Sequence, residues 1–245
     1  MRIVGVDCST DPKKTGLALA SLKGATLAVL EARVARSRED IVDTVSGWLL
    51  KDTDSVLALD APLGWPSSMG NLLAGHRAGC GIDVAGNMMF QRETDRVVHS
   101  ELKKKPLEVG ANLIARTALD ALTTLTELGR KVTLEMGWTP GNVTTRQVIE
   151  VYPAATLASR KINSSRYKEK DATNKRAAIF QELSLDVSDT QTAAAVSVDH
   201  VLDAVICCVA AADYIQGDVI EPEDATLAQR EGWIWVRPAA SRVEA

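Results

Sequence analysis

The sequence predicts an α/β protein in which a mixed β-sheet is flanked by helices. Three closely spaced apolar runs within residues 2–34 are typical of an antiparallel meander. After residue 37 the spacing of apolar residues changes from that of a strand to that of a helix. A compact apolar run at residues 55–60 then predicts another strand. A helix and a strand that follow a three-stranded meander indicate antiparallel strands joined to parallel ones.

The meander accounts for the first three expected strands. Its first run, RIVGVDCS, is rich in β-branched residues and ends at Asp7 before a polar turn. The second and third runs cover residues 16–22 and 25–34. The Lys23-Gly24 pair between them is typical of a hairpin turn.

The next two elements are a helix and a buried strand. Ser37 and Asp40 resemble an acidic capping box, and apolar residues recur at helical spacing after them. The run SVLALD at residues 55–60 reads as a strand. It must end before Pro62, because proline cannot continue a central ladder of hydrogen bonds.

Residues 63–110 interrupt this alternation. They contain seven glycines, the polar segment FQRETDR and the run Lys103–Lys105. We expect a long loop or helical insertion after the strand that ends at Asp60. A segment of this length inside a compact domain is usually functional, as a lid or a binding loop.

The second half of the chain returns to regular spacing. Apolar periodicity predicts helices at 111–128, 174–183 and 197–215, a strand at 147–151 and a strand-like piece at 233–236. Gly129 and Gly217 are suited to end the first and last of these helices. The final residues, ASRVEA at 240–245, have the composition of a disordered tail.

Composition excludes several classes of protein. The 245 residues predict a single domain over 1–245, with its insertion at about 63–110. A net charge of −4 argues against a protein that coats nucleic acid. The four cysteines lack the paired spacing of a zinc site or a disulfide framework. No apolar run approaches the roughly 18–20 residues of a membrane helix, so we expect a soluble cytoplasmic enzyme.

The placement of carboxylates indicates a metal centre. Asp7 and Asp60 each end a strand, Glu150 lies in a third strand, and Asp199 and Asp203 share a helix face. Carboxylates that converge over a sheet edge can hold Mg²⁺ or Mn²⁺ through oxygen. Two such ions, about 3.5–4 Å apart, can promote hydrolysis of a phosphodiester. The alternative is that Asp7 and Asp60 only cap strands or turns.

Six short motifs occur along the chain; each alone is weak evidence for a family, but the ordered set is fairly specific. They are GVDCS at 5–9, LDAPLGWP at 59–66, RETDR at 92–96, EVYPAA at 150–155, DHVLDAVICCVAA at 199–211 and EGWIW at 231–235. Through them the chain resembles the domain-of-unknown-function 429 family of predicted nucleases, in the ribonuclease H-like superfamily. This resemblance implies a ribonuclease H-like fold and a metal-dependent nuclease activity that uses Mg²⁺ or Mn²⁺.

The resemblance also implies roles for particular carboxylates. By motif match, Asp7 and Asp60 would bind the metal directly. Asp199 or Asp203 would complete the site from the late helix. We take Asp203 as the third metal ligand and keep Asp199 as a catalytic candidate. Glu150 either points at the site or pairs with a basic residue of the insertion.

Basic residues of the insertion are candidates for substrate binding. Arg92 and Arg96 lie four residues apart, so a helix would let both engage one phosphate. Lys103 and Lys104 can extend this patch along a nucleic-acid backbone. The alternative is a solvated helix face with exposed ion pairs. His200 can assist a metal or a proton transfer, but it points about 100° away from Asp199 on a helix.

Two other functions compete with the nuclease. The segment DCSTDPKKTGLAL is similar to the first phosphate loop of sugar kinases and actin-like ATPases. Those proteins need a second domain and a second phosphate loop, for which the sequence offers no convincing match. The other alternative is a non-catalytic module that binds nucleic acid or protein, which would follow if Asp7 and Asp60 lay far apart. DNA, RNA and nucleotides are all candidate substrates.

Overall fold

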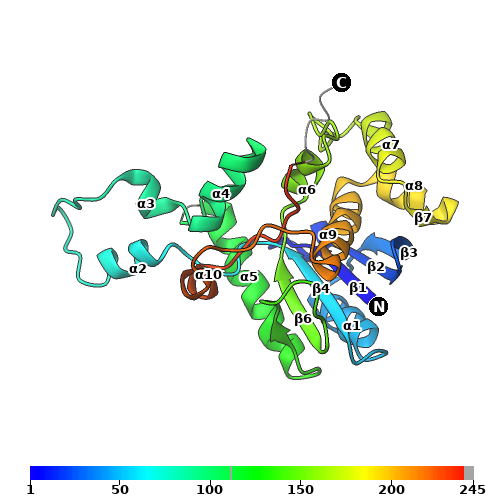
Figure 1. Ribbon diagram of the computed structural model, residues 1–245, viewed down its shortest axis with the longest axis horizontal. Helices are drawn as coiled ribbons and strands as arrows, with labels where there is room; N and C mark the ends of the chain where they lie inside the picture. The colour runs from blue at the N-terminus through cyan, green and yellow to red at the C-terminus, as the bar shows by residue number, and fades with distance from the viewer. Residues whose placement is uncertain (111, 240–245) are drawn as a thin grey trace.

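The computed structural model describes residues 1–110 and 112–239 and shows an α/β fold around a mixed, seven-stranded sheet (Figure 1). The order of the strands across the sheet is β5-β6-β4-β1-β2-β3-β7. Their bounds are β1 Arg2–Asp7, β2 Gly16–Lys23, β3 Thr26–Val34, β4 Ser55–Asp60, β5 Glu135–Met136, β6 Arg146–Glu150 and β7 Asp186–Val187.

The expected meander and the switch to parallel pairing are both confirmed. Strands β1, β2 and β3 pair antiparallel, whereas β4 pairs parallel with β1 and β6 pairs parallel with β4. The hairpin between β2 and β3 turns at Gly24, whose φ of 57° suits a residue without a side chain. This arrangement is consistent with the ribonuclease H-like fold that the family resemblance implies. In the β1–β4 pair, Asp7 lies directly opposite Asp60.

Helices cover both faces of the sheet. Their bounds are α1 Arg38–Leu49, α2 Ser67–Leu73, α3 Gly86–Phe90, α4 Glu93–Leu102, α5 Asn112–Gly129, α6 Pro153–Ser159, α7 Thr173–Glu182, α8 Asp189–Ser197, α9 Asp199–Gln216 and α10 Ala225–Glu231. One hydrophobic cluster joins the sheet to α1 and α5, and a larger one joins its other face to α9 with α6, α7 and α8. Every described residue of α9 from Val201 to Tyr214 is buried.

Two glycines allow α9 to lie unusually close to the sheet. A Cβ atom on Gly5 would lie 2.1 Å from the carbonyl oxygen of Ala204. A Cβ atom on Gly16 would lie 1.9 Å from the carbonyl oxygen of His200. Contacts this short are impossible for a real side chain, so these two positions require glycine. The close approach carries the first turns of α9 to the end of β1.

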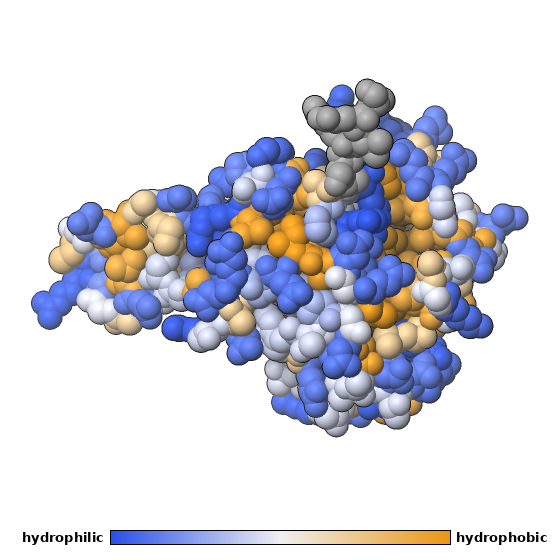
Figure 2. Space-filling view, in the orientation of Figure 1, coloured by the Kyte–Doolittle hydropathy of each residue, from blue (hydrophilic) through white to orange (hydrophobic). Residues whose placement is uncertain are grey.

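The insertion is helical in part. Residues 63–110 contain α2, α3 and α4, where a loop was the other expectation. Helices α2 and α3 project away from the sheet, on the left in Figure 1. Apolar side chains are exposed on this projecting segment, among them Leu73, Met88 and Phe90. Figure 2 shows apolar patches on this segment at the left, and further apolar patches over the centre and the right of the view.

Other expected elements are present with small shifts. Helix α5 begins at Asn112, and residue 111 at the start of the expected helix is outside the described residues. The expected tail at 240–245 is outside them as well. Residues 233–236 contribute one isolated bridge, between Glu150 and Ile234, in place of a full strand. Gly217 ends α9 in the left-handed conformation, as expected.

Among the described helices, none is by itself both long and apolar enough to cross a membrane, and one bent pair, α8 with α9, meets that test only when its two helices are taken together.

Candidate metal centre

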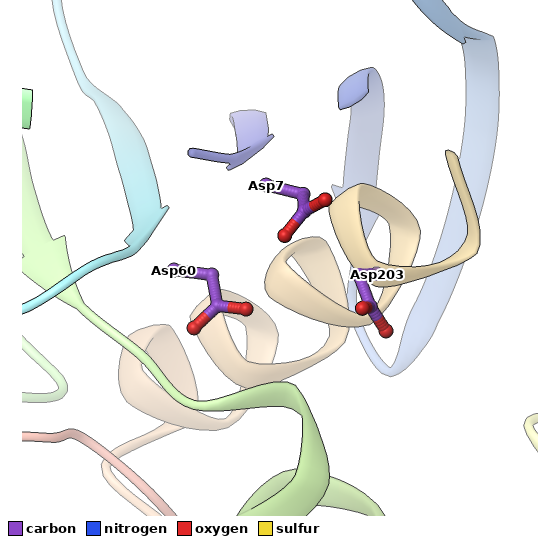
Figure 3. Close-up of side chains that lie close together, drawn as sticks. All are labelled: Asp7, Asp60 and Asp203. Carbon is purple, nitrogen blue, oxygen red and sulfur yellow. The ribbon is translucent and has the colours of Figure 1, made fainter. Parts of the chain in front are cut away.

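Three carboxylates from distant parts of the chain converge at one edge of the sheet. Asp7 ends β1, Asp60 ends β4, and Asp203 lies in the second turn of α9. One oxygen atom from each carboxylate lies within 4.8 Å of the other two. Figure 3 shows the three side chains directed into the same space. The parallel register of β1 and β4 and the close approach of α9 together create this cluster.

The cluster concentrates negative charge in a place with little water. Asp7 is 7% exposed and Asp203 is 0% exposed. Burial raises the pKa of the Asp60 carboxyl well above its usual range, and the charge of Asp7 raises it further. Burial also raises the pKa of Asp203 to about 6, although the positive charge of Lys168 opposes this change.

Three side chains partly compensate this charge. The hydroxyl group of Tyr167 donates a hydrogen bond of 2.6 Å to Oδ1 of Asp203. The ammonium group of Lys168 lies 2.6 Å from Oδ2 of the same residue. Nδ1 of His200 lies 2.6 Å from Oδ2 of Asp7, and this hydrogen bond raises the pKa of the imidazole.

The donor set fits a hard divalent cation. All three candidate ligands offer carboxylate oxygen, which Mg²⁺ and Mn²⁺ prefer over nitrogen or sulfur. Oδ2 of Asp203 is buried and has no hydrogen-bond partner, although the Lys168 ammonium lies close to it. A buried carboxylate oxygen needs a positive partner; the Lys168 ammonium supplies one in this structure, and a divalent cation could supply one in its place.

A small pocket opens beside the cluster. Its volume is about 230 Å³, and Asp7, Asp60 and Lys168 lie along its wall. Much of the remaining wall is apolar and comes from the ends of strands, the insertion and α5: Pro62, Pro106, Leu107, Ile114, Tyr152 and Ile234. A compound bound here would have one polar end at the carboxylates and one apolar part against these side chains.

The structure separates the two aspartates of α9. Asp203 belongs to the cluster, whereas Asp199, at the first residue of the helix, is half-buried and lies outside it. His200 does not act with Asp199, as the helical geometry indicated; it contacts Asp7 instead. Among the four sequence candidates Asp7, Asp60, Asp199 and Asp203, the structure therefore brings together the three that were expected to hold the metal.

Glu150 and Arg92 form a buried ion pair, which is the second of the two alternatives for Glu150 and corrects the expected phosphate-binding role of Arg92. Both oxygens of Glu150 accept hydrogen bonds from Arg92, at 2.8 and 2.9 Å, and one of them also accepts from the backbone of Leu63. The five N–H groups of Arg92 are all used, by Asp95, Glu150 and the carbonyl of Glu231. Arg92 therefore has no donor left for a phosphate, and Glu150 is the partner of the insertion, not a metal ligand.

The remaining basic candidates lie outside the pocket wall. Arg96 donates to the carbonyl of Gln91, and the ammonium of Lys103 donates to the carbonyl of Ser100. Lys104 reaches the hydroxyl of Ser164 at 3.4 Å. Arg96, Lys103 and Lys104 are absent from the described residues that line the pocket. Their expected contact with substrate stays a prediction without support from this geometry.

Sequence reasoning missed the residues that surround Asp203. Tyr167 and Lys168 lie in the loop between α6 and α7. The available signal was the basic stretch at 160–176, which carries seven lysines and arginines against two acidic residues. That excess predicts a positive surface, but it does not show which side chain turns inward.

Comparison with known proteins gives one match. A family model described as "Protein of unknown function (DUF429)" matches residues 5–227. This range includes five of the six motifs noted in the sequence and leaves out EGWIW at 231–235. No curated protein and no solved structure matches the chain.

Proposed function

The chain belongs to the DUF429 family, and within that family we propose that it is a metal-dependent nuclease in which Asp7, Asp60 and Asp203 hold Mg²⁺ or Mn²⁺. The observation that carries this proposal is the convergence of one oxygen from each carboxylate within 4.8 Å. Three acids at such distances, two of them buried and one half-buried, destabilise one another unless cations compensate them. Proteins keep such arrangements at functional sites.

The side chains around the cluster have separate roles in this proposal. When bound, the cation would polarise a phosphoryl oxygen and make water a stronger nucleophile. Tyr167 fixes the orientation of Asp203 by its hydrogen bond, and His200 does the same for Asp7. These contacts hold two of the three candidate ligands in place before any substrate arrives.

The pocket supports a nucleic acid or nucleotide as the substrate. Its volume of about 230 Å³ is below the roughly 300–1,000 Å³ typical of drug-sized ligands, so it suits one small group. Apolar side chains such as Ile114 and Tyr152 offer a surface for the flat face of a base. A phosphate attached to that base would then lie near the carboxylates.

The same geometry favours a nuclease over a non-catalytic binding module. Asp7 and Asp60 lying far apart would have favoured that alternative, whereas they lie opposite each other on paired strands. A binding module gains nothing from bringing three like charges together, because their desolvation lowers the free energy of unfolding.

A cleavage assay tests the proposal. Labelled single-stranded, duplex, hybrid and branched substrates are incubated with Mg²⁺ or Mn²⁺ at matched protein and salt concentrations. We expect Asp7→Asn, Asp60→Asn and Asp203→Asn each to reduce cleavage at least about 100-fold, because each removes a charged ligand. Asp199→Asn is the matched control, since it makes the same change one turn away from Asp203 and outside the cluster.

The outcomes separate the competing functions. Cleavage that is lost in the three cluster variants and kept in the control supports the nuclease. Cleavage that survives in all of them contradicts the proposed site. A wild-type protein that cleaves none of the substrates with either metal contradicts the nuclease and supports the binding module.

A further inference from the structure

The loop between α6 and α7 brings a positive charge into the carboxylate cluster. The Lys168 ammonium lies 2.6 Å from Oδ2 of Asp203, which is fully buried. The lysine side chain itself is 53% exposed. The ammonium therefore reaches a buried acid from the solvent side, and the rest of the side chain has room to move away.

The backbone on both sides of Lys168 is held in place. Arg176 is 2% exposed and donates from one nitrogen to the carbonyls of Tyr167 and Glu169, at 2.8 and 3.0 Å. Tyr167 is anchored again by its hydrogen bond to Asp203. A buried arginine that binds the carbonyl groups on both sides of one lysine fixes the position of the backbone from which that lysine side chain extends. The position of Lys168 is thus built into the fold.

The contact between the ammonium and Asp203 is electrostatic in kind. The two groups form an ion pair, with 2.6 Å between the ammonium nitrogen and Oδ2 of Asp203. Burial lowers the pKa of Lys168, but the charges of Asp203 and Asp60 raise it by more. Because one oxygen of each carboxylate lies within 4.8 Å of the other two, the charge of Lys168 beside Asp203 acts on the whole cluster.

From this geometry we propose that Lys168 is a built-in cation that neutralises the carboxylate cluster in the metal-free protein, and that a divalent cation must displace its ammonium from Asp203 to bind. The inference rests on the metal site of the proposed function. Oδ2 of Asp203 cannot contact the ammonium and a metal ion at the same short distance without strong repulsion between the two cations. Lys168 then stabilises the empty site and weakens the binding of metal.

Calorimetric titration of metal-free protein with MnCl₂ tests this inference without using activity. We expect Lys168→Met to bind Mn²⁺ at least about tenfold more tightly than the wild type. Lys170→Met is the matched control, because it removes an exposed lysine two residues further along the same loop. Lys168→Arg keeps the charge and should bind Mn²⁺ within about threefold of the wild type.

Thermal unfolding gives a second readout that does not depend on the titration. In the presence of a chelator, Lys168→Met should melt at a lower temperature than the wild type, because its buried acids lose their counter-ion. Saturating Mn²⁺ should raise the melting temperature of this variant by more than it raises that of the wild type.

The failure of this inference is distinguishable from the failure of the proposed function. If the wild type binds Mn²⁺ and Asp60→Asn does not, the metal site of the proposed function is supported. If Lys168→Met then binds Mn²⁺ equally or more weakly, competition by the lysine is overturned. If neither wild type nor Lys168→Met binds Mn²⁺, the metal site itself is overturned, and the inference with it.

Discussion

At the scale of single residues, the carboxylates of the cluster are candidate metal ligands, and the same charges destabilise the metal-free fold. Asp60 lies opposite Asp7 on the neighbouring strand and is desolvated, so its charged form is disfavoured in the folded protein. Asparagine has nearly the same shape and no charge. A substitution there should therefore stabilise the metal-free fold while it removes a candidate ligand, as expected for active-site residues that trade stability for activity.

We predict that Asp60→Asn raises the melting temperature in a chelator at pH 7 by about 2–4 °C, which corresponds to about 1 kcal/mol in a protein of this size. The effect has a defined sign with pH. The folded state raises the pKa of Asp60, so ionisation in the unfolded state above about pH 4 favours unfolding. The advantage of the variant should thus be absent near pH 4 and grow toward pH 7.

Differential scanning calorimetry between pH 4 and pH 7 checks this expectation. Asp199→Asn, outside the cluster, should not show the same growth in stability with pH. A melting temperature of Asp60→Asn that falls below that of the wild type at pH 7 would show that the Asp60 carboxylate stabilises the metal-free fold.

At the scale of elements, the contact between α9 and the sheet positions Asp203. The sequence predicted β1 from its β-branched run and α9 from its apolar periodicity, and it placed Asp7 at the end of the strand. It gave no physical reason to prefer Asp203 over Asp199 as the third ligand, because the rotation of a helix relative to a sheet depends on packing between distant segments. The reason for that packing is visible in Gly5, where a Cβ atom has no space.

Short elements were the least predictable for a related reason. Helices α6 and α10 have seven residues each, and strands β5 and β7 have two. Elements this short have too few residues to show a period, so neighbouring segments determine them. The loop that carries Lys168 was missed on the same grounds, since only the contact with Arg176 reveals its direction.

A substitution at Gly5 tests the element scale. Gly5→Ala would place Cβ 2.1 Å from the carbonyl oxygen of Ala204, so α9 must move away from β1. We expect a loss of about 1–3 kcal/mol in the free energy of unfolding, typical of overpacking, and weaker binding of Mn²⁺ because Asp203 moves with the helix. Urea unfolding and calorimetric titration measure the two effects.

Gly47→Ala is the matched control for this prediction. Gly47 lies within α1, and apart from its chain neighbours and the backbone of its own helix no described atom lies within 4 Å of a Cβ placed there. Alanine in an open helical position should increase stability by about 0.5–1 kcal/mol and leave Mn²⁺ binding unchanged. Equal effects of the two substitutions would show that close packing at Gly5 does not position the cluster.

At the scale of the whole molecule, two buried acids attach the insertion to the body. Glu150 at the end of β6 accepts from the backbone of Leu63 and from Arg92. Glu231 at the end of α10 accepts from the backbone of Ser67 and of Glu93. The projecting segment, residues 68–91, thus leaves and rejoins the body at positions that these two acids hold. The sequence showed where the insertion begins and raised the pairing of Glu150 with one of its basic residues, but it did not show which residue that is.

Breaking this attachment should cost far more than exposed ion pairs do. Glu150→Gln leaves the Arg92 guanidinium buried with less negative charge beside it, so we expect a loss of about 3–5 kcal/mol in the free energy of unfolding. The double variant Glu150→Gln with Arg92→Met removes the buried cation too and should recover part of that loss. Urea unfolding of the two single variants and the double variant measures the coupling.

The same set of variants separates attachment from metal binding. If Glu150 holds the insertion and no metal, Glu150→Gln should still bind Mn²⁺ with nearly the wild-type affinity under conditions where it is folded. If Glu150→Gln instead reduced the affinity for Mn²⁺ as strongly as Asp60→Asn does, Glu150 would be a metal ligand. Since Arg92 occupies both oxygens of Glu150 in the structure, we expect the first result.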